Sequence, residues 1–393
     1  MDEKEKLVPK RRFKEFKNSG AWEQRKLGSI YQFQYGHFNN NPDNGGIYPI
    51  YGANGIIGGY HGFNAENSVV IGHMGAYAGH VLWVEGKHFV TYNGTIGFPK
   101  DLNFDRKFGF HMLQHINIPK ITAGSGQPFV SYSDLENIKL YISDSIDEQN
   151  KLGYFFDMLE NTIALHQREL DNLKITKQVF MKKMFPKEGE KVPEVRFPGF
   201  MADWDYRKLG DVGETYTGLS GKSKDDFGHG RGKYVTYMNV FSNSIANPSL
   251  VELVEIDTKQ NEVNPGDIFF TTSSETPEEV GMSSVWLENS DNTYLNSFCF
   301  GYRPIEKFDN YYLAYMLRSS VVRKKITFLA QGISRYNISK NKVMDIAVPI
   351  PVIEEQTKIG EFFKQLDDII NLQQQELEKL KQTKQAFLQK MFI

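Results

Sequence analysis

The chain repeats one segment twice, and this repeat constrains its architecture more than any other feature. The first copy carries Ile146, Glu148, Gln149, Lys151, Gly153, Phe155 and Phe156, and the second carries Ile353, Glu355, Gln356, Lys358, Gly360, Phe362 and Phe363. A shorter match lies upstream of each copy, where Trp22, Arg25, Lys26, Leu27 and Gly28 correspond to Trp204, Arg207, Lys208, Leu209 and Gly210. The stretches between the matches barely resemble each other. Because internal repeats decide the architecture before other patterns, we expect a duplicated frame that carries two unlike globular blocks.

The repeated segments predict two long helices, at about Asp147–Phe185 and Glu354–Phe392. Apolar residues recur at alternating spacings of three and four, which is the heptad pattern of a coiled coil. The expected seam comprises Leu159, Ile163, His166 and Leu170 in the first copy and Leu366, Ile370, Gln373 and Leu377 in the second. At about 1.5 Å per residue each helix spans roughly 55–60 Å. Two copies of one unit are best related by a two-fold axis, so the helices are expected to be antiparallel with the blocks at opposite ends.

The polar seam positions have two readings. His166 and Gln373 either meet across the seam and fix its register, or they face solvent or a partner subunit. Lys177 and Lys384 occupy seam positions near the helix ends, from which their charged groups can reach water by snorkelling.

Both globular blocks predict mixed α/β domains built from short strands. The first, Trp22–Ser143, has dense glycine turns between apolar runs such as Ser68–Ile71 and Val81–Val84. In the second block, Trp204–Ile350, strands are expected at Tyr234–Val240, Leu250–Ile256, Asp267–Thr272 and Ser297–Tyr302, and a helix near Asn310–Leu329. The fold class is therefore α+β: two mixed α/β domains joined by two long antiparallel coiled-coil helices with pseudo-two-fold symmetry. The expected boundaries are 1–145, 146–186, 187–352 and 353–393.

Composition narrows the classes of function. The formal net charge of −2 weighs against a protein that holds nucleic acid mainly by bulk electrostatics, but base edges can be read by neutral side chains. The single cysteine, Cys299, lies in an apolar run and is expected to be a buried, reduced thiol. The charged N-terminal segment lacks a signal-peptide core, and no apolar run reaches membrane-spanning length. We therefore expect a cytoplasmic protein without a membrane partner.

Motifs for catalysis are incomplete. Gly221-Lys222-Ser223 lacks the upstream glycine of a phosphate-binding loop, and the Asn-Pro dipeptides do not continue as an adenine methyltransferase motif does. His111 and His115 have the i, i+4 spacing of zinc ligands, but no cysteine or flanking glutamate supports a metal site. Surface or DNA-facing histidines are the expected alternative. The chain is predicted to be non-enzymatic and to carry no cofactor or metal.

At these motifs the sequence resembles the specificity subunit of type I restriction-modification enzymes, over essentially its whole length. The resemblance is carried by Trp204 with Arg207-Lys208-Leu209-Gly210, by Asn337-Ile338-Ser339, and by Val348-Pro349-Ile350-Pro351 before Glu354-Glu355-Gln356. One departure is Pro128-Phe129-Val130-Ser131, which stands where Tyr336-Asn337-Ile338-Ser339 sets the pattern, and it puts in doubt whether the two loops make equivalent contacts.

The resemblance implies a division of labour. The blocks would be target-recognition domains that read an asymmetric, two-part site on double-stranded DNA with an unread gap, and the helices would be a spacer. Two methyltransferase subunits with S-adenosylmethionine would modify adenine N6. Two restriction/motor subunits with ATP and Mg²⁺ would cleave. Half-sites one DNA turn apart are separated by roughly 34–36 Å, which helices of this length can bridge.

The DNA-binding candidates are polar, basic and aromatic residues in glycine-framed loops. In the first block they are Tyr51, Asn54, His73, Tyr77, Asn93 and Gln127. In the second, Lys222, Lys224, Arg231 and Lys233 suit phosphates, and Ser273, Ser274, Arg335, Tyr336 and Asn337 suit base edges. For each of them an ordinary turn or solvated loop residue is the alternative. An autonomous DNA-binding regulator and a structural adaptor are the rival functions.

Overall fold

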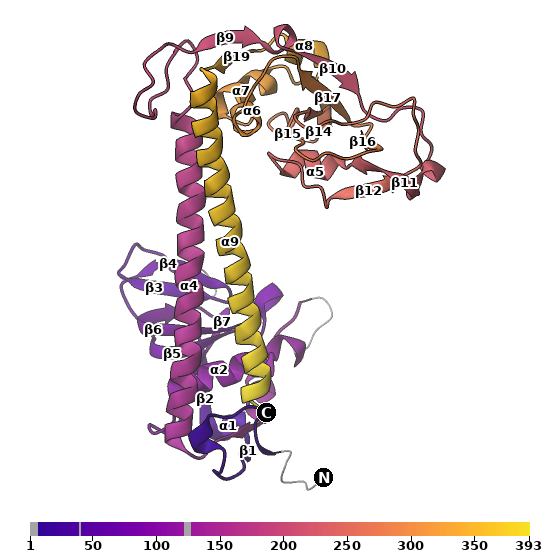
Figure 1. The fold of residues 1–393 in the computed structure, drawn as a ribbon. Helices are drawn as coiled ribbons and strands as arrows, with labels where there is room; N and C mark the ends of the chain where they lie inside the picture. Colours follow the sequence, from indigo (N-terminus) through magenta and orange to yellow (C-terminus); the bar gives the residue numbers. More distant parts are fainter. Residues whose placement is uncertain (1–6, 39–40, 122–126) are drawn as a thin grey trace. The chain divides into compact units, whose positions relative to one another are not determined.

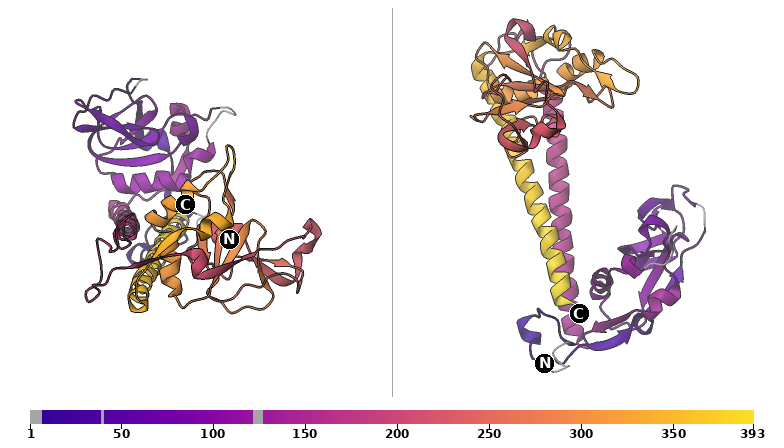
Figure 2. Two further views of the ribbon diagram at one scale, coloured as in Figure 1. Left: turned by 90° about the horizontal axis from the view of Figure 1, so that it is seen from above. Right: turned by 90° about the vertical axis from the view of Figure 1, so that its right-hand side faces the viewer.

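The computed structural model describes residues 7–38, 41–121 and 127–393, and the chain divides into two units (Figure 1). Unit 1 comprises Met1–Arg168 with Gln375–Ile393, and unit 2 comprises Glu169–Gln374. Two long helices, α4 (Ile146–Lys183) and α9 (Ile353–Met391), run without a break from one unit into the other (Figure 2). The helices predicted from the repeat are confirmed, and their bounds differ from the expected ones by one or two residues.

The two long helices are antiparallel. In unit 1 the ring of Phe155 in α4 lies 5.2 Å from that of Phe387 in α9. In unit 2 the ring of Phe180 in α4 lies 5.1 Å from that of Phe362 in α9. The first part of α4 therefore meets the last part of α9, and the last part of α4 meets the first part of α9. These two ring pairs occupy equivalent positions in the two copies of the repeat.

The expected seam residues differ in burial. Leu170, Ile370 and Leu377 are buried, whereas Leu159, Ile163 and Leu366 are half-buried. Of the polar members, Gln373 donates from Nε2 to Glu169 Oε2 at 3.0 Å in unit 2, and His166 is half-buried in unit 1.

Each unit adds an ion pair between the two long helices. Lys177 Nζ lies 2.5 Å from Asp367 Oδ1 in unit 2, and Lys384 pairs with Glu160 in unit 1. These lysines were expected to snorkel, but a carboxylate of the opposite helix at the equivalent position binds each one. The two ion pairs are copies of each other in the repeat, so both units fix the pairing of α4 with α9 by the same contact.

Unit 1 contains a twisted sheet whose described strands run in the order β2-β7-β5-β6-β3-β4. The sheet strands are β2 (Tyr31–Tyr35), β3 (Tyr48–Gly52), β4 (Gly55–Tyr60), β5 (Ala65–Gly72), β6 (Val81–Val90) and β7 (Gly94–Pro99). The other elements are η2 (Lys14–Phe16), β1 (Glu23–Lys26), α1 (Leu27–Ile30), η3 (Gly75–Tyr77), α2 (Arg106–Ile116), η4 (Ile118–Ile121), α3 (Tyr132–Asn137) and β8 (Lys139–Ile142). Apolar Val69, Val70 and Ile71 make β5 a buried central strand. The expected runs 68–71 and 81–84 are strands.

Unit 2 divides its strands among smaller sheets. One runs β10 (Gly213–Thr217), β17 (Cys299–Pro304), β13 (Ile268–Thr271), β15 (Ser283–Val285), and another runs β12 (Val251–Val254), β11 (Phe227–Val235), β16 (Thr293–Leu295). A two-stranded ladder joins β14 (Ser273–Ser274) to β18 (Tyr336–Asn337), and a second joins β9 (Asp205–Lys208) to β19 (Ala347–Ile350). The remaining elements are η5 (Leu209–Asp211), η6 (Lys224–Asp226), α5 (Tyr237–Ser242), α6 (Asn310–Leu317), α7 (Ser320–Phe328) and α8 (Lys340–Met344). Cys299 is buried, as expected.

Two predictions for the second block were wrong in detail. The strand expected at Tyr234–Val240 ends at Val235 and is followed by helix α5, because the Thr236 side chain caps that helix by accepting from the N–H of Asn239. The single helix expected at Asn310–Leu329 is two helices, α6 and α7, because Ser319 between them adopts an extended backbone with ψ 151°.

Among the described residues, no helix combines the length and the apolar character that crossing a membrane requires.

Candidate nucleic-acid interface

The repeated glutamate and glutamine of α4 fasten the first block to the helix. In unit 1, Arg12 donates to both oxygens of Glu148, at 2.5 and 2.7 Å, and Glu148 is fully buried. The backbone N–H of Asp105 donates to Gln149 Oε1 at 3.1 Å. Asp105 in turn caps α2, because its side chain accepts from the N–H of Phe108 at 2.6 Å. The start of α2 is thus held on α4.

Unit 2 makes the same contacts with its own residues. Arg196 donates to both oxygens of Glu355, at 2.7 and 2.8 Å. The N–H of Asp309 donates to Gln356 Oε1 at 3.1 Å, and Asp309 caps α6 by accepting from Tyr312 N–H at 2.8 Å. We call the set Arg12, Glu148, Gln149, Asp105 and its counterpart Arg196, Glu355, Gln356, Asp309 the repeat clasp. This clasp places two unlike blocks on the helices by identical chemistry.

In unit 1 a returning loop passes beside the end of β5. The N–H of Val130 donates to the carbonyl of His73 at 2.9 Å, and Met74 forms an antiparallel bridge with Phe129. The N–H of His73 donates to the carbonyl of Asn93 at 2.8 Å, which brings the turn after β6 to the same place. Three separate segments therefore meet at the end of this strand.

Unit 2 repeats this arrangement at the end of β13. The N–H of Ile338 donates to the carbonyl of Thr272 at 2.9 Å, as Val130 does to His73. The ladder between β14 and β18 pairs Ser273 with Asn337 and Ser274 with Tyr336. The two loops therefore make equivalent backbone contacts within their own units, although their sequences differ.

The first-block candidates come from several segments that meet near the end of β5. Asn93 and Gln127 are exposed near His73, whose ring is buried and whose Nδ1 lies 2.9 Å from the carbonyl of Val130. Tyr51 and Asn54 belong to the β3–β4 hairpin and Tyr77 to η3. Both segments reach the end of β5, because a Cβ at Gly72 would lie 2.0 Å from the Tyr77 carbonyl oxygen and 3.3 Å from the Cβ of Ala53. Asn54 and Tyr77 are exposed and Tyr51 is half-buried.

The second-block candidates form two groups. Ser273, Ser274, Arg335, Tyr336 and Asn337 come together on or beside the β14–β18 ladder, where Arg335 and Asn337 are exposed and both serines are buried. The basic candidates lie elsewhere, on η6, on β11 and in the turn before them: Lys222, Lys224, Arg231 and Lys233.

One basic candidate is already neutralised. Lys222 Nζ lies 3.0 Å from Asp257 Oδ2, and its hydrogen bond lowers the pKa of Asp257 to about 2. Its charge is therefore less available to a phosphate than the charges of the exposed Lys224, Arg231 and Lys233.

An aromatic cluster beside His73 was not foreseen. The ring of Tyr35 lies 3.9 Å from that of Tyr132 and 4.3 Å from that of His73, and Tyr92 lies 5.4 Å from His73. Burial raises the pKa of Tyr132 to about 12. The only sequence signal was the closeness of Tyr92 and Tyr132 to turn residues. These rings pack against one another and against His73 at the end of the strand.

Arg318 is buried in unit 2 and stabilises the segments behind the β14–β18 ladder. Its guanidinium donates to the carbonyls of Ser283, Val240, Phe241 and Asn243 at 2.7–3.0 Å. Burial lowers its pKa to about 10. These bonds hold α5, and the hydroxyl of Tyr237 in α5 donates to the carbonyl of Ser273 at 2.7 Å. Arg318 therefore positions the ladder indirectly, a role that the sequence pattern did not reveal.

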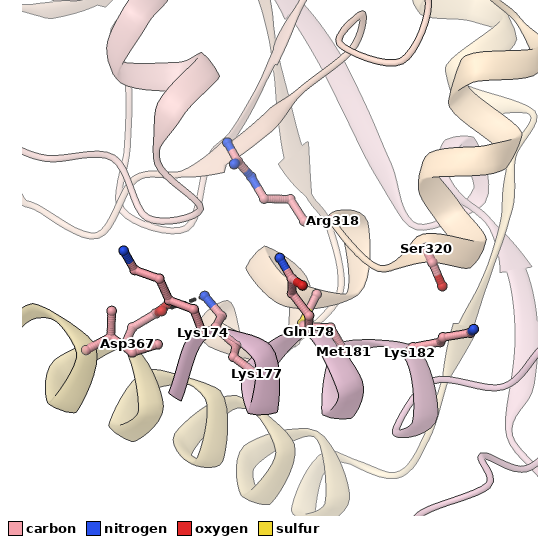
Figure 3. Close-up of a pocket in the computed structure, with 9 residues that line it drawn as sticks. Lys174, Lys177, Gln178, Met181, Lys182, Arg318, Ser320 and Asp367 are labelled. Carbon is pink, nitrogen blue, oxygen red and sulfur yellow. Dashed lines mark hydrogen bonds and ion pairs between the residues drawn. The ribbon is translucent and has the colours of Figure 1, made fainter. Parts of the chain in front are cut away.

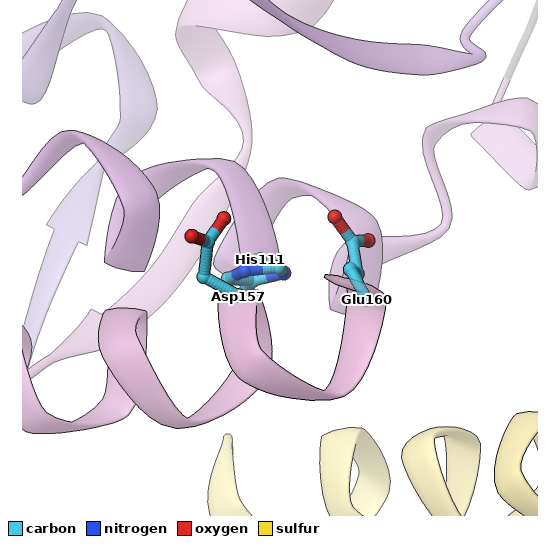
Figure 4. Close-up of side chains that lie close together, drawn as sticks. All are labelled: His111, Asp157 and Glu160. Atoms are coloured by element: carbon cyan, nitrogen blue, oxygen red, sulfur yellow. The ribbon is translucent and has the colours of Figure 1, made fainter. Parts of the chain in front are cut away.

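The cluster most like a metal site lies in unit 1, where His111 faces Asp157 and Glu160 (Figure 4). One ligand atom from each lies within 4.8 Å of the others. However, Lys107 binds Asp157 at 2.7 Å and Lys384 binds Glu160, so both carboxylates are already neutralised. Burial lowers the pKa of His111 to about 4. The donor set fits an ion-paired structural network better than a cation site.

The expectation for the histidines of α2 was wrong. His111 is fully buried, and its Nδ1 lies 3.2 Å from Gln114 Oε1. His115 stacks on Phe392 with ring centroids 5.7 Å apart. The i, i+4 spacing therefore places both rings against the long helices rather than on a DNA-facing surface.

Equivalent cavities lie beside the interhelical ion pairs. In unit 2 a cavity of about 510 Å³ is lined by Lys174, Lys177, Gln178, Lys182 and Asp367 of the long helices and by Arg318 and Ser320 (Figure 3). In unit 1 a cavity of about 310 Å³ is lined by Lys384, Gln385 and Leu388 with Gln114. Both lie between a long helix and the globular block that it carries, and both have mixed polar and apolar walls.

The candidate interface gathers amide, hydroxyl, guanidinium and ammonium groups at the strand ends. Such groups donate and accept hydrogen bonds at base edges and phosphates.

Comparisons with known proteins give a consistent result. The family model described as type I restriction modification DNA specificity domain matches residues 20–174 and 201–382. The MjaVIII specificity subunit of Methanocaldococcus jannaschii is 24% identical over 297 residues, which cover 68% of this chain and 64%, just under two thirds, of that subunit.

Solved structures share the fold. The S subunit of a type I restriction-modification system from M. genitalium superimposes with a TM-score of 0.66 at 15% identity, covering 98% of this chain and 99% of that one. A chain from a structure on complex assembly and conformational transition of the type I R-M system gives a TM-score of 0.55 at 17% identity, covering 94% and 97%. With both matched segments covering most of the sequence, the chain belongs to the family of type I restriction-modification DNA specificity domains.

Proposed function

We propose that this chain reads an asymmetric, two-part site on double-stranded DNA, one half with each unit. The observation that carries this proposal is the pair of equivalent strand-end loops that hold unlike side chains. Met74, Phe129 and Gln127 in unit 1 stand where Ser273, Asn337 and Arg335 stand in unit 2. The same backbone contacts thus present different hydrogen-bonding groups.

The exposed members of each loop have the chemistry of base readers. Arginine pairs with guanine through O6 and N7, and asparagine or glutamine pairs with adenine through N6 and N7. Arg335 and Asn337 are exposed in unit 2, and Asn93 and Gln127 are exposed in unit 1. An asymmetric site follows because the two sets differ.

The chain acts without catalysis, as the subunit that supplies specificity. Two methyltransferase subunits carry S-adenosylmethionine, flip an adenine out of the duplex and methylate N6. Two motor and restriction subunits use ATP and Mg²⁺ for cleavage. Support for a partner on the helices comes from Tyr154, Met158 and Leu165, which share one face of α4 in unit 1 and are 69%, 49% and 54% exposed. The frame is duplicated, which favours two copies of the partner.

A block exchange tests the proposal. The chain is coexpressed with its methyltransferase in a host without other adenine methylation, and methylated adenines are located by single-molecule sequencing. Replacing Trp22–Ser143 with the equivalent block of an unrelated specificity subunit should change one half of the methylated site and leave the other half and the gap unchanged. The reciprocal exchange of Trp204–Ile350 is the matched control and should change only the other half.

Three outcomes contradict the proposal. If one exchange changes both halves of the methylated site, each unit does not read its own half. If the purified chain alone transfers a methyl group from S-adenosylmethionine, the chain is itself catalytic. Failure to copurify with a methyltransferase while binding an operator on its own favours an autonomous regulator.

A further inference from the structure

One long stretch of unit 2 has no acidic residue, and it includes β18 of the β14–β18 ladder. From Asn310 to Met344 the sequence has no Asp or Glu but has seven basic residues, although the whole chain has a net charge of −2. The basic residues are Arg318, Arg323, Lys324, Lys325, Arg335, Lys340 and Lys342. Arg318 and Arg323 bind backbone carbonyls, whereas Lys324, Arg335, Lys340 and Lys342 are exposed. These four exposed cations suit a polyanion, and the acidic groups nearest to them along the neighbouring segment are the exposed Glu275, Glu278 and Glu279 that follow β14.

The loop in the middle of this stretch is closed tightly. Gln331 and Asn337 exchange two backbone hydrogen bonds, at 3.0 and 2.8 Å, so residues 332–336 form its tip. Gly332 has φ +147°, and a Cβ there would meet the carbonyl oxygen of Arg335 at 2.1 Å. The amide of Asn337 reaches back to the same carbonyl at 3.4 Å. On the other side, Ile338 is buried in the main core of unit 2.

Ile333 stands at the tip of this braced loop. Its side chain is 96% exposed, the highest value among the exposed large hydrophobic residues of the described chain. Its neighbours Gly332, Ser334 and Arg335 are exposed and small or cationic. A single exposed aliphatic residue is ordinary on a protein surface. A fixed one, on a cationic loop beside the candidate base readers, has the chemistry of residues that DNA-bending proteins insert between base pairs.

We infer that Ile333 is an apolar wedge, which enters a base-pair step at or beside the half-site read by unit 2. This inference rests on the proposed function. Lys340 and Lys342 hold the flanking phosphates while Arg335 reads the adjacent base edge, and the braced loop keeps the isoleucine from folding back onto the protein. Insertion buries a side chain that is otherwise in water, which offsets the unstacking of the step.

The test uses the complex of this chain with its methyltransferase on the duplex that the methylation map defines. 2-Aminopurine replaces one base at a time across the unit 2 half-site and the two flanking steps, at positions other than the methylated adenine. With the natural chain, fluorescence should rise several-fold at one position, because the base there loses its stacking partner. Ile333→Ser should abolish that rise and weaken binding about tenfold, whereas Ile333→Leu should keep both.

Met201→Ser is the matched control. Met201 is 92% exposed, also lies in unit 2, and belongs to the segment before β9 rather than to the interface. This variant should change neither fluorescence nor affinity. Ile333→Ser, Ile333→Leu and Met201→Ser should all have the melting temperature of the natural chain, because the replaced side chains are in water.

The outcomes separate the two proposals. If the natural complex binds the mapped duplex but no position brightens, or if the rise survives Ile333→Ser, the wedge is refuted and the proposed function stands. If Ile333→Ser instead weakens copurification with the methyltransferase and leaves the rise intact, Ile333 is a protein contact. If the natural complex shows no preference for the mapped duplex, the proposed function itself fails and the wedge with it.

Discussion

Glu148→Gln is expected to destabilise unit 1 severely. Glu148 is 0% exposed, and it accepts hydrogen bonds from Arg12, from Trp22 Nε1 at 3.2 Å and from Ser143 Oγ at 2.5 Å. The Arg12 side chain is only 7% exposed, so removing the carboxylate leaves a buried cation without its partner. Breaking such a pair costs about 3–5 kcal/mol. For a unit of this size that is a fall in melting temperature of roughly 6–20 °C.

The second copy of the repeat clasp supplies the comparison. Glu355 is equally buried, but Trp204 Nε1 has no hydrogen-bond partner where Trp22 binds Glu148. The Arg196 side chain is 14% exposed, so water can solvate it in part. Glu355→Gln should therefore lower the free energy of unfolding of unit 2 by about 3 kcal/mol, the lower end of that range.

Hydrogen–deuterium exchange in urea is the suitable assay, because two units need not unfold together. Amides of α2 report on unit 1 and amides of α6 on unit 2. Glu148→Gln should speed exchange in α2 and leave α6 unchanged, and Glu355→Gln should do the reverse. The double variant Arg12→Met with Glu148→Leu is the control, since replacing a whole buried pair by apolar groups is often nearly neutral. A loss below about 1 kcal/mol for Glu148→Gln, or equal loosening of both units, contradicts the reasoning.

Three further predictions follow from the described contacts. Gly153→Ala and Gly360→Ala should each destabilise the unit that carries the substitution, although alanine favours helices. The reason is that the new Cβ would lie 2.3 Å from Asp105 Oδ1 in the first case and 2.4 Å from Asp309 Oδ1 in the second. Chemical denaturation measures the effect, and a variant more stable than the natural chain contradicts it. The free energy of unfolding of unit 1 should fall by up to about 3 kcal/mol between pH 6.5 and pH 4, because burial lowers the pKa of His111 to about 4 and the unfolded chain binds the extra proton. His111→Tyr, which copies Tyr315 of unit 2, should remove this pH dependence in denaturation experiments. The Cys299 thiol should resist Ellman's reagent until unfolding, because burial raises its pKa to about 12; rapid labelling of the native chain contradicts that.

The sequence predicted the long helices well because their heptad spacing persists over many turns. It could also identify the repeat clasp residues as important, since Glu148 and Gln149 recur as Glu355 and Gln356. It could not predict their partners, because Asp105 and Asp309 lie far away in stretches that do not resemble each other. Their roles became visible only when the two caps were compared in space.

The errors have local causes. The apolar run at Tyr234–Val240 is too short for its period to separate strand from helix, and the cap at Thr236 decides the outcome. The break at Ser319 has no glycine or proline to announce it. The ion-pair partners of Lys177 and Lys384 could not be predicted, because a sequence does not show which carboxylates face them. In the second block, the candidates of the β14–β18 ladder were brought together, whereas Lys224, Arg231 and Lys233 lie on η6 and β11, because a sequence does not show which loops share one face.

The acid-free stretch from Asn310 to Met344 has a practical consequence. With an isoelectric point near 6.5 the chain should migrate slowly in an electric field at neutral pH, like a protein with no affinity for polyanions. Yet Lys324, Arg335, Lys340 and Lys342 of this stretch are all exposed, within a segment of sequence that has no acidic residue. Retention on heparin, and its decline with added salt, should therefore follow these few lysines and arginines, so bulk charge is a poor guide to how this molecule behaves during purification.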